Sequence, residues 1–371
     1  MTVATPASAT SPRPADSTTI PTSEAPRLAR LTVDLGALVA NWRFFQSQAR
    51  RAECAAVVKA DGYGMGASRC AQALAQAGAR TFFVACHGEG LQLRAALGPG
   101  AAIHVLGGLE PHDMPAAHAA GLSPVLNRLD QIAAWGERGP WALQIDTGMA
   151  RLGLPLSERS EVPESAQPAL VLSHLACASD PDNVMNRAQL DSFSAARARL
   201  SAPAYSLAAS AGALLGRAYQ FDLIRPGIGL FGGAPLDVGG PKLATVATLT
   251  APVLQTRPIK AGAAVGYGAT FFAPTDGHIA TIGAGYADGV LRSLSGKGYA
   301  AAHGRTFAYA GRVSMDLITL WDETGALKPG EDVELLGALA PVDDLAARAG
   351  TIAYEVLTQL ARTPRSYIGL A

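Results

Sequence analysis

The chain lacks the features that mark several large classes of protein. Its 30 Lys and Arg residues balance 30 Asp and Glu residues, and only 16% of all residues are charged. Nucleic-acid binding depends on clustered positive charge, and no long basic run is present, so we expect neither a nucleic-acid partner nor a membrane-surface partner. No apolar stretch reaches the roughly 18 residues that a membrane-spanning helix requires, so we expect no membrane span.

Cysteine is scarce as well. Four cysteines in 371 residues form no CxxC pair and no zinc-ligand spacing; they are Cys54, Cys70, Cys86 and Cys177. Unpaired cysteines in a chain of this length favour a reducing compartment, which predicts a cytoplasmic protein without a metal site. The first 27 residues are rich in Ser, Thr, Pro and Ala and lack both an apolar core and a basic start. Residues 1–27 are therefore interpreted as a disordered tail, not as a secretory signal.

Apolar residues, in contrast, make up 49% of the chain and form strand-length runs between helical stretches such as 68–79 and 186–200. The runs occupy residues 54–59, 81–85, 102–107, 122–127, 141–146, 170–175, 204–209 and 221–226. Most are continuous rather than alternating, which is typical of parallel strands buried on both faces. Repeated strand–helix units predict an α/β fold, an N-terminal (β/α)8 barrel of the TIM type, with an open doubly wound sheet as the alternative.

The pattern changes near residue 244. Alternating apolar residues and turn residues are frequent from there on, and helical stretches are few before 341–361. We therefore expect a barrel over residues 28–243 and a C-terminal β-rich domain over residues 244–371. The strand over 30–35 precedes the barrel strands, and it is a candidate to join the sheet of the second domain.

Polar side chains recur at the carboxyl ends of the expected barrel strands, where barrels of this type carry their functional groups. These residues are Lys59, Tyr63, Asp146, Arg151, His174, Ser210 and Arg225. Each alone is more often a solvated strand cap, but their shared rim favours a site. Glycines follow the last two strands, as in "RPGIG" at 225–229, where backbone N–H groups commonly bind phosphate. A lysine opposite a phosphate cup suggests pyridoxal phosphate, which forms a Schiff base with lysine.

Seven motifs, in this order, closely resemble those of the bacterial alanine racemases. They are "VVKADGYGMG" (57–66), "DTGMARLG" (146–153), "RPGIGLFG" (225–232), "VGYGAT" (265–270), "IGAGYADG" (282–289), "GRVSMD" (311–316) and "YEVLTQLARTPR" (354–365). The resemblance covers roughly residues 28–371. It implies a barrel that binds pyridoxal 5'-phosphate, a C-terminal β-domain, and a homodimer whose active sites are shared. It also implies interconversion of L- and D-alanine through an external aldimine, supplying D-alanine for peptidoglycan.

The same resemblance implies a role for each matching residue. Lys59 is the Schiff-base lysine and the base on one face of the substrate, and Tyr267 of the partner subunit is the base on the other face. The expected cofactor-binding residues are Lys59, Tyr63, Arg151, His174, Ser210, Arg225, Gly227, Ile228 and Tyr354. Arg151, Met315 and Asp316 are expected to bind the substrate, and Tyr286, Arg292, Arg312 and Ile352 to line its access channel.

The chain departs from the family pattern at Gln144. Many members have there a carbamylated lysine, whose negative charge positions the arginine that corresponds to Arg151. Glutamine cannot carry a carbamate, so an amide hydrogen bond or a small anion such as chloride is expected to replace it. Ser314 stands where the family has cysteine, a change expected to leave the chemistry unaltered.

Two other functions remain open from the sequence. A related pyridoxal-phosphate racemase or decarboxylase would act on serine or a larger amino acid. A non-catalytic barrel would bind the cofactor alone, but such proteins resemble only the first domain. The second domain, which carries Tyr267, argues against this last reading.

Overall fold

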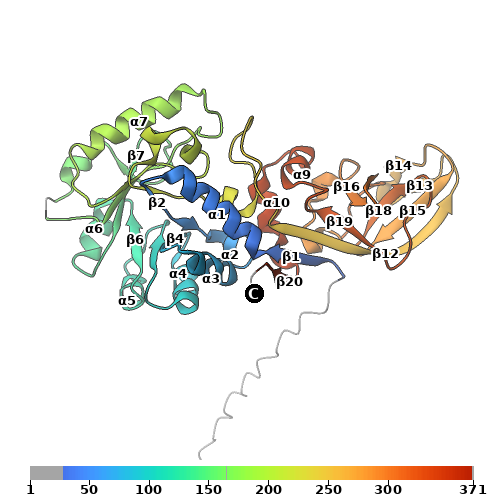
Figure 1. Cartoon of the computed structure of the whole chain (residues 1–371), viewed down its shortest axis with the longest axis horizontal. Coiled ribbons are helices and arrows are strands. Elements are labelled where there is room, and N and C mark those ends of the chain that lie inside the picture. Colours follow the sequence, from blue (N-terminus) through green and yellow to red (C-terminus); the bar gives the residue numbers. More distant parts are fainter. Residues whose placement is uncertain (1–27, 164, 370–371) are drawn as a thin grey trace, which may run out of the picture.

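The computed structural model describes residues 28–163 and 165–369. The expected tail over residues 1–27 lies outside the described residues. Figure 1 shows two lobes side by side, a ring of strands with helices around it and an elongated lobe made mostly of strands. The long strand β12 (Ala247–Ile259) runs outward from the junction along the second lobe.

The first lobe is a closed parallel barrel. In the described part of the chain eight parallel strands form its wall, where β2 and β3 together count as the first. They are β2 (Glu53–Cys54) with β3 (Ala56–Val57), β4 (Thr81–Val84), β5 (Ala102–Val105), β6 (Ser123–Leu126), β7 (Ala142–Asp146), β9 (Leu170–Leu172), β10 (Tyr205–Ser206) and β11 (Leu223–Ile224). β11 pairs in parallel with β2, which closes the barrel. On the other side of β11, the Arg225 N–H donates to the Ala208 carbonyl at 2.8 Å and so joins the end of β11 to the chain after β10. The predicted barrel is confirmed, and the open-sheet alternative is wrong.

Burial explains why the runs are continuous. Every residue of β4 and every residue of β6 is buried, because one face of each strand meets the barrel interior and the other meets a helix. The covering helices are α3 (Ala67–Ala77), α4 (His87–Leu97), α5 (Met114–Ala119), α6 (Leu129–Trp135), α7 (Val184–Arg197) and α8 (Arg217–Gln220). Parallel strands joined in this way place all their carboxyl ends at one rim.

The second lobe is built on an antiparallel sheet. Its order is β17-β16-β19-β12-β1-β20, with β15 and β18 extending from β12. The strands are β1 (Arg30–Asp34), β15 (Gly277–Ile282), β16 (Tyr299–Ala302), β17 (Arg305–Ala308), β18 (Ile318–Asp322), β19 (Asp332–Leu336) and β20 (Arg365–Ile368). β1 pairs antiparallel with β12 and parallel with β20, so a segment that precedes the barrel belongs to this sheet. The domain boundary at 243/244 stays a prediction.

The remaining elements are α1 and a set of short helices, strands and turns. They are α1 (Leu35–Ala49), α2 (Lys59–Tyr63), α9 (Val342–Ala349), α10 (Ala353–Gln359), β8 (Leu154–Pro155), β13 (Ala264–Val265), β14 (Phe271–Phe272) and the 3-10 turns η1 (Arg159–Glu161), η2 (Gly212–Leu214), η3 (Ile228–Phe231), η4 (Tyr267–Ala269), η5 (Tyr286–Asp288), η6 (Arg292–Leu294) and η7 (Leu360–Arg362). β13 and β14 form a hairpin whose turn is η4. In Figure 1 this hairpin lies at the far end of the second lobe from the barrel.

The junction of the lobes is held by a buried asparagine. The Asn41 side chain on α1 donates to the carbonyls of Leu230 and Ala244 and accepts from the Ala244 N–H at 2.8 Å. One amide thus ties the chain after the barrel to the helix before it.

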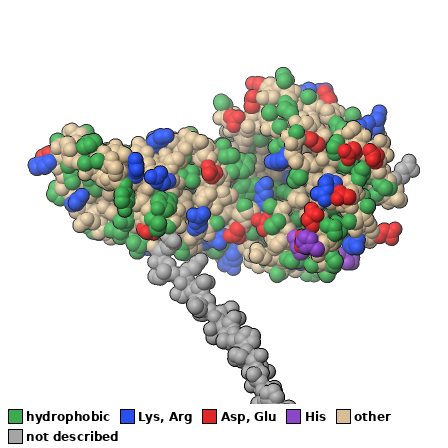
Figure 2. Space-filling view, turned by 180° about the vertical axis from the view of Figure 1, so that it is seen from behind, with side chains coloured by type: hydrophobic (Ala, Val, Ile, Leu, Met, Phe, Trp, Pro, Cys, Tyr) green, Lys and Arg blue, Asp and Glu red, His purple; other side chains and the backbone are tan. Residues whose placement is uncertain are grey.

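The surface carries no dominant charge on the face that Figure 2 shows, where acidic and basic side chains are interspersed. None of the helices in the described residues combines the length and the apolar character of a membrane-spanning segment.

Candidate active site

Lys59 lies at the start of an unusual turn. β3 ends at Val57, and α2 then begins at Lys59, but its following residues are left-handed: Ala60, Asp61, Gly62 and Tyr63 have φ values of 53°, 51°, 63° and 53°. For any residue other than glycine, this conformation costs about 1–2 kcal/mol of conformational energy. The turn is therefore strained, and contacts from elsewhere must hold it.

The second lobe contacts this turn and the residues that follow it. Arg365 on β20 binds the Asp61 carboxylate at 2.5 Å and donates to the Gly64 carbonyl at 3.1 Å. Gly66 has a φ of +91°, and a Cβ there would lie 2.1 Å from the Tyr367 hydroxyl, so only glycine fits. The second lobe thus packs directly against the segment that carries Lys59.

A cup of small groups lies after the last two barrel strands, β10 and β11. The Ser210 Oγ accepts the N–H groups of Gly227 at 2.9 Å and Gly229 at 3.3 Å, so its own proton remains available to donate to a ligand. A Cβ on Gly227 would lie 2.2 Å from the Tyr63 hydroxyl. The Tyr63 ring stacks on Phe231 with centroids 4.8 Å apart.

Tyr354 completes this aromatic edge. It lies on α10, and its ring centroid is 6.0 Å from that of Tyr63. Burial raises the pKa of both phenols, so both stay protonated and can donate. The expected phosphate-side residues Tyr63, Ser210, Gly227 and Tyr354 therefore lie together, and Ile228 follows directly in η3.

Cationic groups lie near His174. Burial, followed by the charges of Arg225, Arg151 and Lys59, lowers the pKa of His174 to about 3, so this imidazole is neutral at physiological pH. Burial followed by the charge of Arg151 lowers the pKa of Lys59, while the Glu89 carboxylate opposes this shift. Four expected residues are thereby brought together, in an environment that favours an anionic ligand.

Arg225 is buried and held by neutral partners. Its guanidinium donates to the Ser206 hydroxyl and, at 2.6 Å, to the Ser173 carbonyl. Burial lowers its pKa to about 10, which still leaves it charged at neutral pH. The Phe83 ring lies 5.9 Å from it, and His104 stacks on Phe83 with centroids 4.8 Å apart.

Gln144 acts on the chain next to Arg151. Its buried amide donates to the main-chain carbonyl of Leu152 at 2.9 Å. The preceding loop is closed by Asp146, whose carboxylate accepts the N–H groups of Gly148 and Met149, both at 2.9 Å. A neutral hydrogen bond to the backbone thus anchors the segment that carries Arg151.

Tyr354 apart, the expected residues of the second lobe are exposed. Tyr267 in η4 is 71% exposed, and Met315 is 55% exposed. Met315 lies beside Tyr286, because the N–H of Tyr286 donates to Ser314 at 3.0 Å and that of Ala287 donates to Met315 at 2.9 Å. The other members of this group, Asp316, Arg292, Arg312 and Ile352, are exposed too. In Figure 1 the β13–β14 hairpin with Tyr267 lies far from α2 with Lys59.

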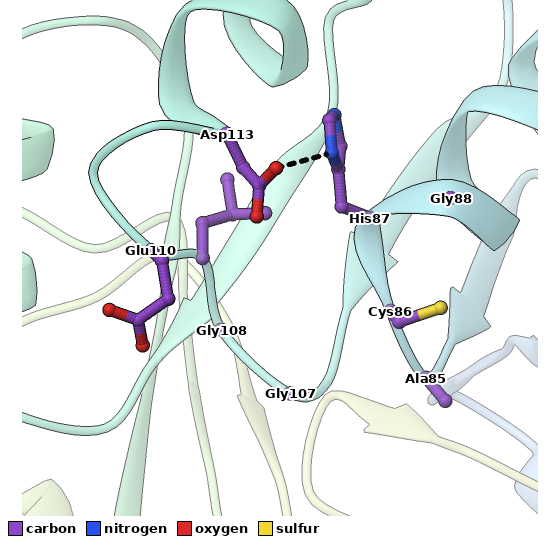
Figure 3. Close-up of a pocket in the computed structure, with 9 residues that line it drawn as sticks. Ala85, Cys86, His87, Gly88, Gly107, Gly108, Glu110 and Asp113 are labelled. Atoms are coloured by element: carbon purple, nitrogen blue, oxygen red, sulfur yellow. Dashed lines mark hydrogen bonds and ion pairs between the residues drawn. The ribbon is translucent and has the colours of Figure 1, made fainter.

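A separate cavity of about 350 Å³ opens at the carboxyl ends of β4 and β5 (Figure 3). His87 points toward Asp113 across it, with Nδ1 and Oδ1 3.1 Å apart, and Glu110 lies on the same wall. Its lining residues include none of the expected site residues. Within residues 28–163 and 165–369, no group of three or more His, Cys, Asp or Glu could hold a metal ion.

The sequence reading missed the residues that support the site. Glu89, Asp61 and Arg365 hold the Lys59 turn, and Ser206 holds Arg225. Glu89 lies in the first turn of α4, shortly after β4, and this position at the rim was the one sign in the sequence that it could support the site.

Fold and site together define a two-domain barrel protein with an amine and an anion-binding cup at one rim. The profile of "Alanine racemase, N-terminal domain" matches residues 33–235, and that of "Alanine racemase, C-terminal domain" matches residues 246–367. The chain therefore belongs to the alanine racemase family.

Similar proteins cover nearly the whole chain. An alanine racemase of Dinoroseobacter shibae is 47% identical over 92% of this chain and 98% of its own length. The biosynthetic alanine racemase of Agrobacterium fabrum is 45% identical over 91% and 93%. The structure of alanine racemase from Bartonella henselae, with covalently bound pyridoxal phosphate, is 38% identical and superposes with a TM-score of 0.88, covering 92% of this chain and all of that one.

The buried histidines predict a dependence of stability on pH. Burial, followed by the charge of Arg225, lowers the pKa of His104 to about 4, whereas an unfolded histidine has a pKa near 6.5. Between these values the unfolded state binds more protons, so the free energy of unfolding should fall as pH falls from about 6.5 to 4, by about 3 kcal/mol for this group. Denaturant titrations of His104→Leu should show a flatter pH dependence than wild type.

Ser123→Ala is the matched control, because Ser123 is the register neighbour of His104 on β6 and does not titrate. Its curve should run parallel to that of wild type. A His104→Leu curve as steep as wild type would contradict the assignment.

Proposed function

We propose that this protein is an alanine racemase that interconverts L- and D-alanine, with pyridoxal 5'-phosphate held on Lys59. The observation that carries the proposal is the Lys59 amine, whose pKa is lowered by burial and by Arg151, placed among groups that suit an anionic cofactor. Family membership over nearly the whole chain supports the same conclusion.

The residues present fit this cofactor. Ser210 has a free hydroxyl proton beside the backbone of Gly227, where any side chain would collide with Tyr63, so a phosphate can approach closely. Ser210, Gly227, Ile228, Tyr63 and Tyr354 would hold the phosphate. Arg225 would face the pyridine nitrogen with His174 nearby, and Arg151 the phenolic oxygen.

Racemisation requires one group to remove the α-proton and another to return a proton on the opposite face. When bound, the cofactor withdraws electrons from the α-carbon and so makes its proton acidic. Lys59 acts on one face, because its lowered pKa increases the fraction of neutral amine that can accept a proton. Arg225, with a pKa of about 10, stays charged and only donates, so it would favour an unprotonated cofactor nitrogen.

Tyr267 is the proposed proton carrier on the other face. Within one chain it lies on a hairpin at the far end of the second lobe, distant from Lys59 in Figure 1. A second copy of the chain must therefore supply it, which makes the protein a homodimer with Tyr267 of the partner subunit in each site. Phe272, an exposed aromatic residue on β14 of the same hairpin, suits such an interface.

The proposed role of the product in the cell rests on family membership alone. We propose that D-alanine made in the cytoplasm supplies peptidoglycan. Both a biosynthetic and a catabolic alanine racemase of Agrobacterium fabrum are similar to this chain, at 45% and 44% identity.

The function is tested by measuring the D/L interconversion of alanine, serine and lysine by the purified protein with the cofactor bound. Alanine should give the highest kcat/KM, serine a lower one and lysine none, because the matching residues are those of an alanine-type site. Faster turnover of serine or lysine would favour the related racemase. Cofactor binding without any racemisation would favour the non-catalytic barrel.

The shared site is tested by mixing two inactive variants. Lys59→Ala and Tyr267→Phe should each lower kcat by about 100-fold or more, since each removes a proton carrier. After joint unfolding and refolding, half of the dimers are hybrids with one intact site, so activity should recover to about one quarter of wild type. A mixture of Tyr267→Phe with Tyr267→Ala is the control and should recover nothing. No recovery in the first mixture would contradict a site built from two chains.

A further inference from the structure

We propose that Glu89 is a positioning residue, whose carboxylate ties the left-handed turn that carries Lys59 to the end of strand β4. The inference rests on the proposed function only in taking Lys59 as the reacting amine. Nothing in the motifs that define the family site assigns Glu89 a role.

Each carboxylate oxygen of Glu89 accepts one backbone N–H, and we call this pair of hydrogen bonds the brace. Oε1 of Glu89 accepts the N–H of Ala60, the residue after Lys59, at 2.7 Å. Oε2 accepts the N–H of Ala85, just after β4, at 2.7 Å. Hydrogen bonds from N–H to an ionised oxygen are about twice as strong as neutral ones. Glu89 lies in the first turn of α4, where the helix dipole stabilises a negative charge.

The turn needs such a brace at this point. Ala60 is the first left-handed residue, with φ 53° and ψ 51°, and this conformation sets the direction in which the chain leaves Lys59. The opposite side of the turn is held by Arg365 on Asp61. Glu89 therefore fixes the end nearest the lysine, and its second oxygen links that end to the backbone just after β4.

The carboxylate also acts on the amine through its charge. Burial and Arg151 lower the pKa of Lys59, and Glu89 opposes them. A neutral replacement would remove this opposing effect. The same side chain thus influences both where the amine lies and how readily it takes up a proton.

Glu89→Gln separates these effects from a general role in stability. Glutamine has one oxygen, so one of the two N–H groups would face an NH₂ group. In the holoenzyme we expect kcat for alanine to fall at least tenfold with KM within threefold of wild type. Backbone hydrogen exchange should accelerate at residues 58–66. In the full chain freed of cofactor, the pH midpoint for reductive methylation of Lys59, followed by peptide mass spectrometry, should move down.

Two further variants complete the test. Glu110→Gln removes a carboxylate from the wall of the neighbouring cavity, 3.7 Å from Arg128, and should leave all three readouts at wild-type values. Glu89→Asp keeps the charge but is too short to reach both N–H groups. It should accelerate exchange at 58–66 while keeping the Lys59 midpoint near wild type, and it carries the test if Glu89→Gln does not fold.

The inference is overturned if Glu89→Gln keeps kcat within twofold of wild type, if exchange at 58–66 is unchanged, or if the Lys59 midpoint does not move. Because exchange and labelling do not depend on racemisation, they report on the brace even where the wild-type protein proves inactive on alanine. Failure of the proposed function and failure of this inference are therefore distinguishable.

Discussion

The site depends on one strained stretch of backbone, the left-handed turn from Ala60 to Tyr63. A strand that continued straight, or a right-handed helix, would carry Lys59 and Tyr63 in other directions. In the turn, Lys59 faces Arg151 and His174, while Tyr63 packs on Phe231 beside Gly227. Three residues other than glycine adopt the unfavourable conformation, at about 1–2 kcal/mol each, so the surrounding contacts must exceed that cost.

Those contacts explain why the chain has two lobes joined so closely. Arg365 and Tyr367 reach the turn from β20, and β20 pairs with β1, the strand just before the barrel begins. The second lobe therefore supports the lysine of its own chain through β20. Through Tyr267, it is proposed to complete the site of another chain. On this proposal the same domain stabilises one site and completes a second.

The sequence predicted the barrel well because continuous apolar runs such as 81–85 are direct signs of burial on both faces. It also placed Lys59, His174 and Arg225 at one rim, since parallel strands share their carboxyl ends. The left-handed turn was not predictable, because distant partners such as Glu89 and Arg365 stabilise it against the local preference of Ala60 and Asp61. The bond from Gln144 to the Leu152 carbonyl was likewise beyond a reading of residue types, which named only an amide or an anion.

We propose that this turn presents the Lys59 amine to the cofactor. Borohydride reduction of the holoenzyme, followed by proteolysis and mass spectrometry, tests it directly, because reduction makes the bond between amine and aldehyde permanent. We predict one pyridoxyl group per chain, on the peptide that contains Lys59. A pyridoxyl group on Lys242, Lys260, Lys297 or Lys328, or on no lysine at all, would contradict the account.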